Sequence, residues 1–571
     1  MGKTERSEVT VNNGDVDIED MRVPPIGYDD FIEVRDGDLL YVDKSALIDR
    51  ILSEKFKAYL FTRPRRFGKS LNLSMLDAYL NLEYKDHAGK WFDGLEITRL
   101  RPDDPEMNAY PVVFVNFKDL DGKDMQTIQC SLRDLIADLY ENFDYLAESE
   151  SLTRTQKLRF DSCVGMTADL STLVSAVKNL CRMLERHHKR KVVLLIDEYD
   201  RVVNSAYGKP YQKEVLELIS GILSPALKSN TSLKFAVVTG VMQIAKDGIF
   251  SGFNNAYVDN VLDTQFDEMF GFTADDIKTI LGDGEHPEKF GEVREWYDGY
   301  RFGNADIYNP WSVLIYVSKG FETGSTGWAL TGSTQIVVDM IQRSGPKAYS
   351  DILAMSNGGI ISHKVDPAIT FDQMSSGTDA LYSIMVMSGY LKAVPDGSGS
   401  YILSAPNREI SGFLMETLIK MAGAAGSADE LKDSTFSRNV KRLKDAIQEY
   451  LVPMSHSDLK WESSYKDMLY GAYRALCPYH RVYPDPRAGN GFSDITMERV
   501  KGDQPNVVIE FKRIDPDSNP SQERLLKVAE EGLAQIRDRD YPRTLKGRTI
   551  LYGMAFHKKD VEIVKEEIDK G

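Results

Sequence analysis

The chain has 571 residues, enough for about three or four domains. Hydrophobic residues make up 42% of it and charged residues 27%, as in ordinary globular proteins, and no apolar run approaches the ~18 residues of a membrane span. The net charge of −17 disfavours nonspecific binding of polyanions by the whole surface, but it is compatible with acidic sites that hold divalent metal.

Residues 1–22 are polar, with no apolar signal core and no arginine-rich transit pattern, so we expect a flexible tail on a cytoplasmic protein that does not contact a membrane. The four cysteines are scattered and form no C-x-x-C pair, and the eight histidines include no H-E-x-x-H. These spacings argue against a disulfide scaffold and against a zinc cluster.

From about residue 28 the pattern alternates between short apolar runs and helical periodicity. Lys57–Thr62 predicts a strand, and a helix with apolar positions on one face follows the next loop. Buried-type strands are also predicted at "YPVVFVNF", "KVVLLIDEYD" and "LKFAVVTG". Alternation of this kind is typical of an α/β fold with a mainly parallel sheet, which we assign to residues 23–265.

Residues 266–450 contain few convincing strands, and we expect a helix-rich middle domain. A smaller α/β unit is expected at 451–571, with the order helix, strand, turn, strand, helix, strand, helix.

The segment "TRPRRFGKS" ends like a phosphate-binding loop, G-x-x-x-x-G-K-[ST], but Arg63 stands where the first glycine belongs. A strand precedes the segment and an amphipathic helix follows it. In such a loop Lys69 reaches the β- and γ-phosphates of a nucleotide and the Ser70 hydroxyl ligates Mg²⁺. The alternative is that Gly68-Lys69-Ser70 merely opens a helix, because glycine and serine are good caps.

The strand "VVLLIDEYD" ends in Asp197-Glu198, which has the form of a Walker B segment. There the aspartate holds Mg²⁺ and the glutamate polarises the attacking water. The alternative is a strand followed by an acidic helix cap. A further strand ends in Thr239-Gly240, where a polar side chain could sense the γ-phosphate.

The segment "GFSDITMERVKGDQPNVVIEFKR" predicts two strands joined by a turn. Glu510 and Lys512 lie on one face of the second strand, and Asp494 on the preceding strand could complete a pair of carboxylates. Asp494 and Glu510 would bind Mg²⁺, and Lys512 would orient a water or offset charge, as in metal-assisted phosphodiester hydrolysis. The alternative is an ordinary edge hairpin with a surface Glu–Lys pair.

Several longer segments carry a resemblance to a known family. "YVDKS", "RPRRFGKS", "LLIDEYD", "TGVMQIAKDGIFSGFNNA" and "WYDGYRFGNADIYNPWSVL" are similar to the AAA-ATPase-like proteins fused to a PD-(D/E)XK nuclease domain. The resemblance extends from about Val23 to the C-terminal region. In that family the loop is characteristically R-P-R-R-F-G-K-S/T, so Arg63 is the family's own variant.

The resemblance implies site residues of two kinds. For the nucleotide it implies Walker A positions, Walker B positions and a sensor, namely Gly68, Lys69 and Ser70, then Asp197 and Glu198, then Thr239. For the nuclease it implies the D…ExK core of Asp494, Glu510 and Lys512, an acidic Glu462 on the preceding helix, and Gln535 on the following one. Asp467 is a rival to Glu462, and Gln243 stands where relatives often carry a basic residue.

The function expected from these features is an ATP-dependent, Mg²⁺-dependent nuclease, with DNA as the favoured substrate and self-association left open. Arg63 and Arg66 are expected at the bound nucleotide, where with Arg65 they either replace missing backbone contacts or fill the site. We expect ATP binding with slow hydrolysis. The alternatives are a nucleotide-sensing switch that binds nucleic acid or protein without cutting, and an ATPase that remodels a protein partner.

Overall fold

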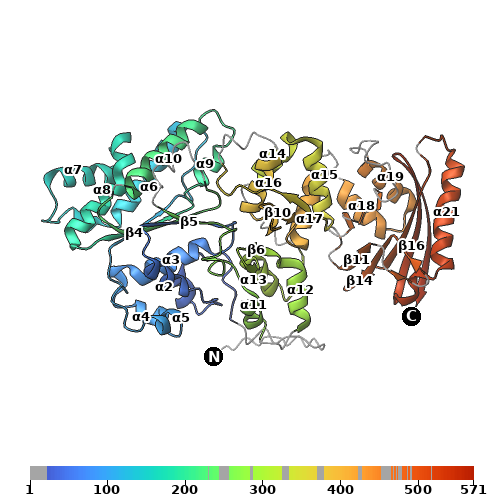
Figure 1. Cartoon of the computed structure of the whole chain (residues 1–571), viewed down its shortest axis with the longest axis horizontal. Helices are drawn as coiled ribbons and strands as arrows, with labels where there is room; N and C mark the ends of the chain where they lie inside the picture. Colours follow the sequence, from blue (N-terminus) through green and yellow to red (C-terminus); the bar gives the residue numbers. More distant parts are fainter. Residues whose placement is uncertain are drawn as a thin grey trace, which may run out of the picture.

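A computed structural model describes most of the chain, with gaps concentrated between 451 and 491. The described residues are 22–228, 230–243, 256–282, 287–324, 334–369, 378–421, 427–451, 465–466, 469–470, 472–473, 477, 479–484, 487–488, 491–515 and 517–570. Figure 1 shows three parts along the long axis, with the N-terminal sheet at one end and α21 (Gln522–Asp538) at the other.

The N-terminal part is built on a five-stranded sheet in which every neighbouring pair is parallel. In spatial order its strands are β2 (Val112–Asn116), β3 (Val192–Asp197), β4 (Leu233–Gly240), β1 (Ala58–Thr62) and β5 (Tyr257–Asp259). β1 and β3 are buried throughout, as their apolar sequences predicted. The parallel α/β fold expected here is confirmed, and it brings the carboxyl ends of all five strands to one edge.

Helices cover both faces of this sheet (Figure 1). They are α1 (Phe31–Asp36), α2 (Ala46–Glu54), α3 (Lys69–Leu80), α4 (Ala88–Phe92), α5 (Glu96–Leu100), α6 (Met125–Glu141), α7 (Arg154–Val164), α8 (Leu170–His188), α9 (Arg201–Ser205) and α10 (Gln212–Leu227). Short 3-10 turns add Leu82–Tyr84 and Asp144–Leu146.

The middle part is rich in helices, as expected. Its helices are α11 (Ala274–Ile280), α12 (Pro287–Tyr297), α13 (Pro310–Ser318), α14 (Thr334–Arg343), α15 (Gly345–Ser356), α16 (Thr378–Met387) and α17 (Arg408–Met421). Its strands are short: β6 (Tyr300–Phe302), β7 (Ala305–Ile307), β8 (Ile361–His363), β9 (Lys392–Pro395) and β10 (Tyr401–Ser404). One hydrophobic core runs without a break from the N-terminal sheet into α14–α17.

The C-terminal part is a five-stranded mixed sheet with helices on both sides. Its strands in spatial order are β11 (His480–Pro484), β14 (Ile495–Arg499), β15 (Asn506–Arg513), β16 (Gly547–His557) and β17 (Asp560–Lys570). Beside them lie α18 (Ser427–Phe436), α19 (Val440–Leu451), α21, the 3-10 turn η6 (Tyr541–Thr544) and the small ribbon of β12 (Arg487–Ala488) and β13 (Gly491–Phe492). Only β15 and β16 pair in parallel; the other pairs are antiparallel. α18 and α19 share the core of this sheet, so the unit includes residues before 451.

The prediction of a helix at the end of the chain was wrong, because strand β17 forms there. It pairs antiparallel with β16 along its whole length. The segment contains many glutamates and lysines, which favour helix, but Val561 and Ile563 alternate with polar residues and are buried on the sheet. Strand pairing therefore outweighs the intrinsic helix preference of this segment.

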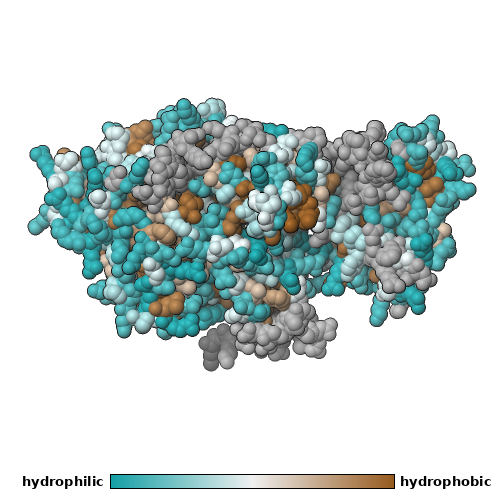
Figure 2. Space-filling view, in the orientation of Figure 1, coloured by the Kyte–Doolittle hydropathy of each residue, from teal (hydrophilic) through white to brown (hydrophobic). Residues whose placement is uncertain are grey.

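The visible face of the molecule is mainly hydrophilic, with small separate hydrophobic areas (Figure 2). Within the described ranges, no helix combines the length and the apolar character needed to cross a bilayer.

Candidate active sites

The loop between β1 and α3 turns at Gly68, directly before the helix begins at Lys69. Gly68 has a φ of +80°, a left-handed conformation that glycine adopts without strain. Nothing lies within 4 Å of the position that a Cβ would take, so the backbone conformation is what requires glycine here. The unpaired N–H groups of a helix N-terminus favour a phosphate at such a position.

The Lys69 side chain is buried and folds back across its own loop. Its Nζ donates to the carbonyl oxygens of Arg63 at 3.0 Å and Pro64 at 2.8 Å. Burial lowers the pKa of the Lys69 ammonium, while the carboxylates of Glu198 and Asp197 oppose that shift. A phosphate bound at the loop would compete with the two carbonyl groups for this ammonium.

Asp197 lies at the carboxyl end of β3 and joins two other predicted site residues. The Ser70 hydroxyl donates to its Oδ2 at 2.6 Å, and the Thr239 hydroxyl donates to its Oδ1. Burial raises the pKa of Asp197, whereas these two hydrogen bonds lower it. Parallel strands β3 and β4 therefore bring the loop serine, the strand-end aspartate and the threonine to one point.

Glu198 follows with a left-handed φ of +51°, and its Oε2 lies 3.6 Å from Arg201 Nη1. Sequence reasoning missed Asp200, a buried carboxylate two residues further on. It accepts hydrogen bonds from the backbone N–H groups of Val241 and Met242, both at 3.0 Å. Asp200 thereby holds the chain that leaves β4. The last residue of "DEYD" was the signal in the sequence that could have identified it.

We expected Arg63 to contact the nucleotide, but the structure places its side chain in the protein core. Its side chain is 0% exposed and forms an ion pair with the buried Asp259 at the end of β5. It also donates to the carbonyl of Phe266 at 3.2 Å, and its guanidinium lies 5.0 Å from the Phe270 ring and 5.3 Å from the Phe302 ring. Burial among these groups leaves the guanidinium no access to a phosphate in this arrangement.

Arg66 is exposed, with a left-handed φ of +68°. Its guanidinium lies 4.2 Å from the ring centre of Trp311 on α13. The ring of the adjacent Phe67 lies 5.0 Å from the Tyr300 ring and 5.1 Å from the Phe302 ring. The loop thus contacts the middle part through two neighbouring side chains, and a phosphate contact by Arg66 stays a prediction.

In the C-terminal sheet, the pairing of β14 with β15 sets the second site. Ile495 is opposite Ile509, so Asp494 lies beside Glu510 at the end of the ladder. The backbone N–H of Phe511 donates to Asp494 Oδ2 at 2.7 Å. Asp494 is half-buried and Glu510 is 3% exposed. The hairpin register therefore brings together the two carboxylates that the sequence pattern paired.

Two further predicted residues contact Glu510 at the same oxygen. Lys512 Nζ donates to Glu510 Oε1 at 2.9 Å, and the side-chain amide of Gln535 on α21 also donates to it. The Gln535 amide donates in addition to the Tyr541 hydroxyl at 3.0 Å. Tyr541 was not expected from the sequence, because only the fold brings η6 against the end of α21.

Two glycines allow α21 to approach the sheet at this point. Gly532 on the helix lies close to Gly553 on β16, which is opposite Glu510 in the parallel ladder. A Cβ at Gly553 would overlap the carbonyl oxygen of Ala529 and lie 2.6 Å from the backbone nitrogen of Leu533. The close contact holds Gln535 at hydrogen-bonding distance from Glu510.

Glu462 and its rival Asp467 lie outside the described residues, and Gln243 is half-buried just before 244–255, which also lie outside. Among the residues that the structure describes, no group of three or more His, Cys, Asp or Glu is arranged to hold a metal ion. Asp494 and Glu510 nevertheless fit Mg²⁺, because this ion is commonly held by one or two carboxylates plus water.

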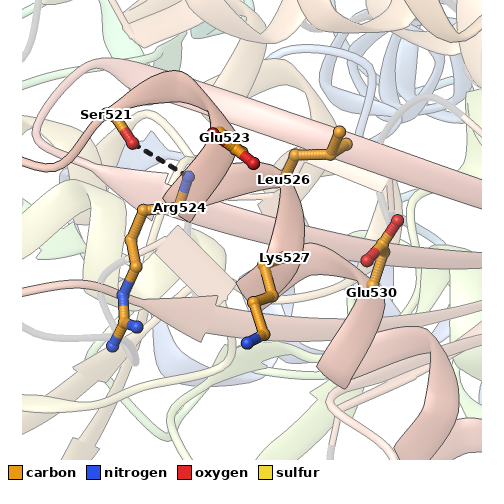
Figure 3. Close-up of a pocket in the computed structure, with 6 residues that line it drawn as sticks. All are labelled: Ser521, Glu523, Arg524, Leu526, Lys527 and Glu530. Carbon is orange, nitrogen blue, oxygen red and sulfur yellow. Dashed lines mark hydrogen bonds between the residues drawn. The ribbon is translucent and has the colours of Figure 1, made fainter.

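A shallow hollow lies along the exposed side of α21 (Figure 3). Both signs of charge line it: Ser521, Glu523, Arg524, Leu526, Lys527 and Glu530. The Ser521 hydroxyl accepts from the backbone N–H of Arg524 and caps the helix. None of the predicted site residues lines this hollow, so it adds nothing to the two sites.

Comparison with known proteins gives a family match for each of the two parts that contain these residues. Residues 25–250 match the family described as predicted AAA-ATPase, and residues 460–566 match the PD-(D/E)XK nuclease superfamily. The chain combines a domain of the first family with a domain of the second. A protein of Azotobacter chroococcum mcd 1, described as "Uncharacterized protein in vnfD 5'region", is 24% identical over 567 residues, which cover 95% of this chain and 96% of the relative.

Proposed function

We propose that the protein is an ATP-hydrolysing enzyme of the cytoplasm whose nucleotide site controls a Mg²⁺-dependent nuclease acting on nucleic acid, with DNA as the favoured substrate. The observation that carries the proposal is the cluster around Glu510. A buried carboxylate with Asp494 beside it, and with Lys512 and Gln535 on one oxygen, supplies metal ligands and a nearby cation of the kind that assist phosphodiester hydrolysis.

At the first site, Lys69 would leave the loop carbonyls and pair with phosphate. Ser70 and Asp197, already 2.6 Å apart, would hold Mg²⁺ between them. Glu198 would orient the attacking water, and Thr239 would respond to the γ-phosphate through Asp197. Each of these roles uses a side chain at the carboxyl edge of the parallel sheet.

At the second site, Asp494 and Glu510 would hold Mg²⁺, which when bound acts as a Lewis acid and lowers the pKa of a coordinated water. Lys512 would offset the negative charge that develops on the phosphate, since its ammonium lies beside Glu510. Gln535 would orient the Glu510 carboxylate through the shared oxygen.

A series of contacts between the two sites supports control of one by the other. Arg66 of the loop lies over Trp311, the second residue of α13. The next residue, Ser312, donates from its hydroxyl to Glu409 Oε2 at 2.8 Å, and both side chains are buried. A displacement of the loop by nucleotide would therefore reach α17.

The contacts continue from α17 into the C-terminal sheet. Arg408, beside Glu409, is buried and donates to the carbonyl oxygens of His480 at 2.9 Å and Cys477 at 3.2 Å. His480 begins β11, which pairs with β14, and Asp494 directly precedes β14. The series therefore connects the loop of the first site with the strand next to Asp494.

The test is a parallel assay of ATP hydrolysis and oligonucleotide cleavage, with Mg²⁺ or Mn²⁺. We expect Lys69→Ala to lower ATP turnover by about 100-fold or more, and Glu510→Gln to lower cleavage by a similar factor while ATP turnover is kept. Trp311→Leu is expected to leave ATP turnover intact and to reduce the effect of ATP on cleavage. Cleavage that survives both Glu510→Gln and Asp494→Asn would contradict the proposed site.

A nucleotide-controlled switch that binds nucleic acid without cutting is the second candidate. It is favoured by the tight docking of the loop, in which Lys69 is held by loop carbonyls and Arg63 is locked to Asp259. Turnover would be slowed because Lys69 has to leave these carbonyls before it can pair with phosphate. ATP binding without hydrolysis, together with nucleic-acid binding that needs no metal, would favour the switch over the enzyme.

A further inference from the structure

The edge strand β11 carries a row of exposed aromatic and basic side chains. Tyr479, directly before the strand, is 42% exposed and Tyr483 is 37% exposed. Arg481 between them is also exposed, whereas the intervening His480 is buried. Side chains of a strand alternate between its two faces, so Arg481 and Tyr483 lie on one face and Tyr479 extends the same row.

The register of β11 against β14 identifies the face of the sheet on which this row lies. Tyr483 is opposite Thr496 and Arg481 is opposite Glu498 in the antiparallel ladder of β11 and β14. Directly opposed residues share a face. Asp494 is two residues before Thr496, so the alternation of β14 puts it at the end of the same face.

The other face of β14 is the core side. Ile495 and Met497 are fully buried there with Ile509 of β15. Helix α21 packs against β15, β16 and β17 on the face of the sheet that carries Glu510, and its Gln535 donates to Glu510. Arg481 and Tyr483 lie on the same face of the sheet, at its β11 edge.

The row lies close to the proposed nuclease site. Two residues along a strand span about 7 Å, so Asp494 is roughly that far from Thr496, the residue opposite Tyr483. A nucleotide stacked on Tyr483 would therefore be a few nucleotides at most from the scissile position. The two tyrosines themselves are four residues apart, a span of about 13 Å.

The charges that face the row include one anion. The Tyr483 hydroxyl donates to Glu498 Oε2 at 3.4 Å, which holds the ring along the strand. Arg481, opposite Glu498 in register, offsets that carboxylate. The chain carries a net charge of −17, so we expect stacking to supply most of the affinity and overall electrostatic attraction to supply less.

We propose that Tyr479, Arg481 and Tyr483 form a binding row for single-stranded nucleic acid that leads into the site of Asp494 and Glu510. Unpaired bases would stack on the two rings, and a phosphate would pair with Arg481. Duplex bases are stacked on one another and cannot cover exposed tyrosine faces in this way. The role of the row in delivering a strand to the site rests on the proposed nuclease function. Binding of the strand to the row does not require cleavage.

The test measures binding by the full-length protein in EDTA, which prevents cleavage. The probes are fluorescein-labelled oligothymidine, oligouridine and a duplex of equal length, so that DNA, RNA and duplex are compared. The double variant of Tyr479→Ala and Tyr483→Ala is expected to weaken binding of the preferred single strand by about 30-fold or more, because it removes two stacked bases. Arg481→Gln is expected to weaken binding less and to reduce its salt dependence.

Matched variants separate stacking from folding. Tyr479→Phe with Tyr483→Phe keeps both rings and is expected to bind within about twofold of wild type, because stacking needs only the aromatic face. Tyr28→Ala removes a tyrosine that is 48% exposed near the other end of the chain, and it is expected to have no effect on binding. Loss of affinity in the Phe variants equal to that in the Ala variants would overturn stacking as the mechanism.

The remaining outcomes distinguish the row from the nuclease. Cleavage by wild type together with equal single-strand affinity in the Ala variants overturns the row and leaves the proposed function standing. Single-strand binding that depends on the tyrosines, without any cleavage, supports the row and contradicts the nuclease. Tighter binding of duplex than of both single strands, or no binding of any probe, overturns the row.

Discussion

The nucleotide site and the nuclease-like site are each built on a five-stranded sheet, the first at its carboxyl edge and the second on one face, and different contacts hold their side chains. At the first, parallel strand ends and one helix start bring Ser70, Asp197 and Thr239 together. At the second, an antiparallel hairpin sets the carboxylates, and a helix pressed against glycines adds Gln535. The first geometry follows from topology, whereas the second depends on close packing.

The arginine-rich loop makes this difference larger. In the N-terminal part, Arg63 and Asp259 form a fully buried ion pair that ties the loop to β5. In the C-terminal part, the cation Lys512 is half-buried and lies at the site itself. Buried charge supports the fold around the first site, whereas charge at the second is available for chemistry. The following predictions test that division, from the largest expected effect to the smallest.

Arg63→Met should lower the free energy of unfolding of the N-terminal part by about 3–5 kcal/mol, because it leaves the Asp259 carboxylate buried without its partner. Chemical denaturation followed by tryptophan fluorescence measures the loss. The control is Lys90→Ala, which breaks the exposed pair with Asp36 and should cost less than about 1 kcal/mol.

A double variant sharpens the same comparison. Arg63→Met combined with Asp259→Leu removes both charges and should recover most of the lost stability. If Arg63→Met instead left stability unchanged and weakened only ATP affinity, Arg63 would be a phosphate ligand and the structural role assigned to it would be wrong.

Gln535→Ala should reduce cleavage by about 10- to 100-fold, the range typical of residues that orient a metal-binding carboxylate, and it should leave ATP turnover unchanged. The loss should be partly recovered at high Mg²⁺ if Gln535 acts by orienting Glu510. The control is Gln522→Ala at the start of the same helix, where the amide donates to Glu562 at 2.7 Å, far from Glu510.

Gly553→Ala should destabilise the C-terminal part by about 1–3 kcal/mol, because the added methyl group overlaps the backbone of α21 and forces the helix outward. Cleavage should fall with it, since Gln535 moves away from Glu510. Gly89→Ala is the matched control: it lies in α4 with nothing within 4 Å of its Cβ position, and it should change stability by less than about 1 kcal/mol. Equal effects of the two substitutions would contradict the packing argument.

The smallest effect concerns pH. Burial raises the pKa of Asp197 above its ordinary value of 3.8, so the folded protein keeps a proton there that the unfolded chain has lost. Without nucleotide, the contribution of this group to stability should therefore fall as pH rises from 3.8 through the raised pKa.

Asp197→Asn should remove that decline and raise stability above the window, as measured by thermal midpoints across pH. The control, Asp503→Asn, changes an exposed carboxylate in the turn before β15 and should leave the profile as in wild type. If the thermal midpoint of wild type instead rose through this pH window, and Asp197→Asn removed the rise, the pKa of Asp197 would be lowered by folding and the prediction would be wrong.

Local patterns in the sequence were enough to predict the class of fold and the strand ends on which the first site is built. Apolar runs that end in polar residues predicted β1, β3 and β4, and parallel strands necessarily bring such ends to one edge. The same reasoning failed for 560–570, where composition favoured a helix and pairing with β16 decided for a strand. Glu462 and Asp467 lie outside the described residues, so the choice between them stays a prediction.

The sequence by itself determined that Lys69 and Ser70 open a helix after a strand and that Asp197 ends a strand, because those positions depend on neighbours a few residues away. Only the tertiary structure decided the place of Arg63. Its partner Asp259 is 196 residues distant, and no local spacing indicates that the two charges are buried together. Contacts between distant segments decide which charges reach solvent, and that is why the arginine standing for the missing glycine lies in the core.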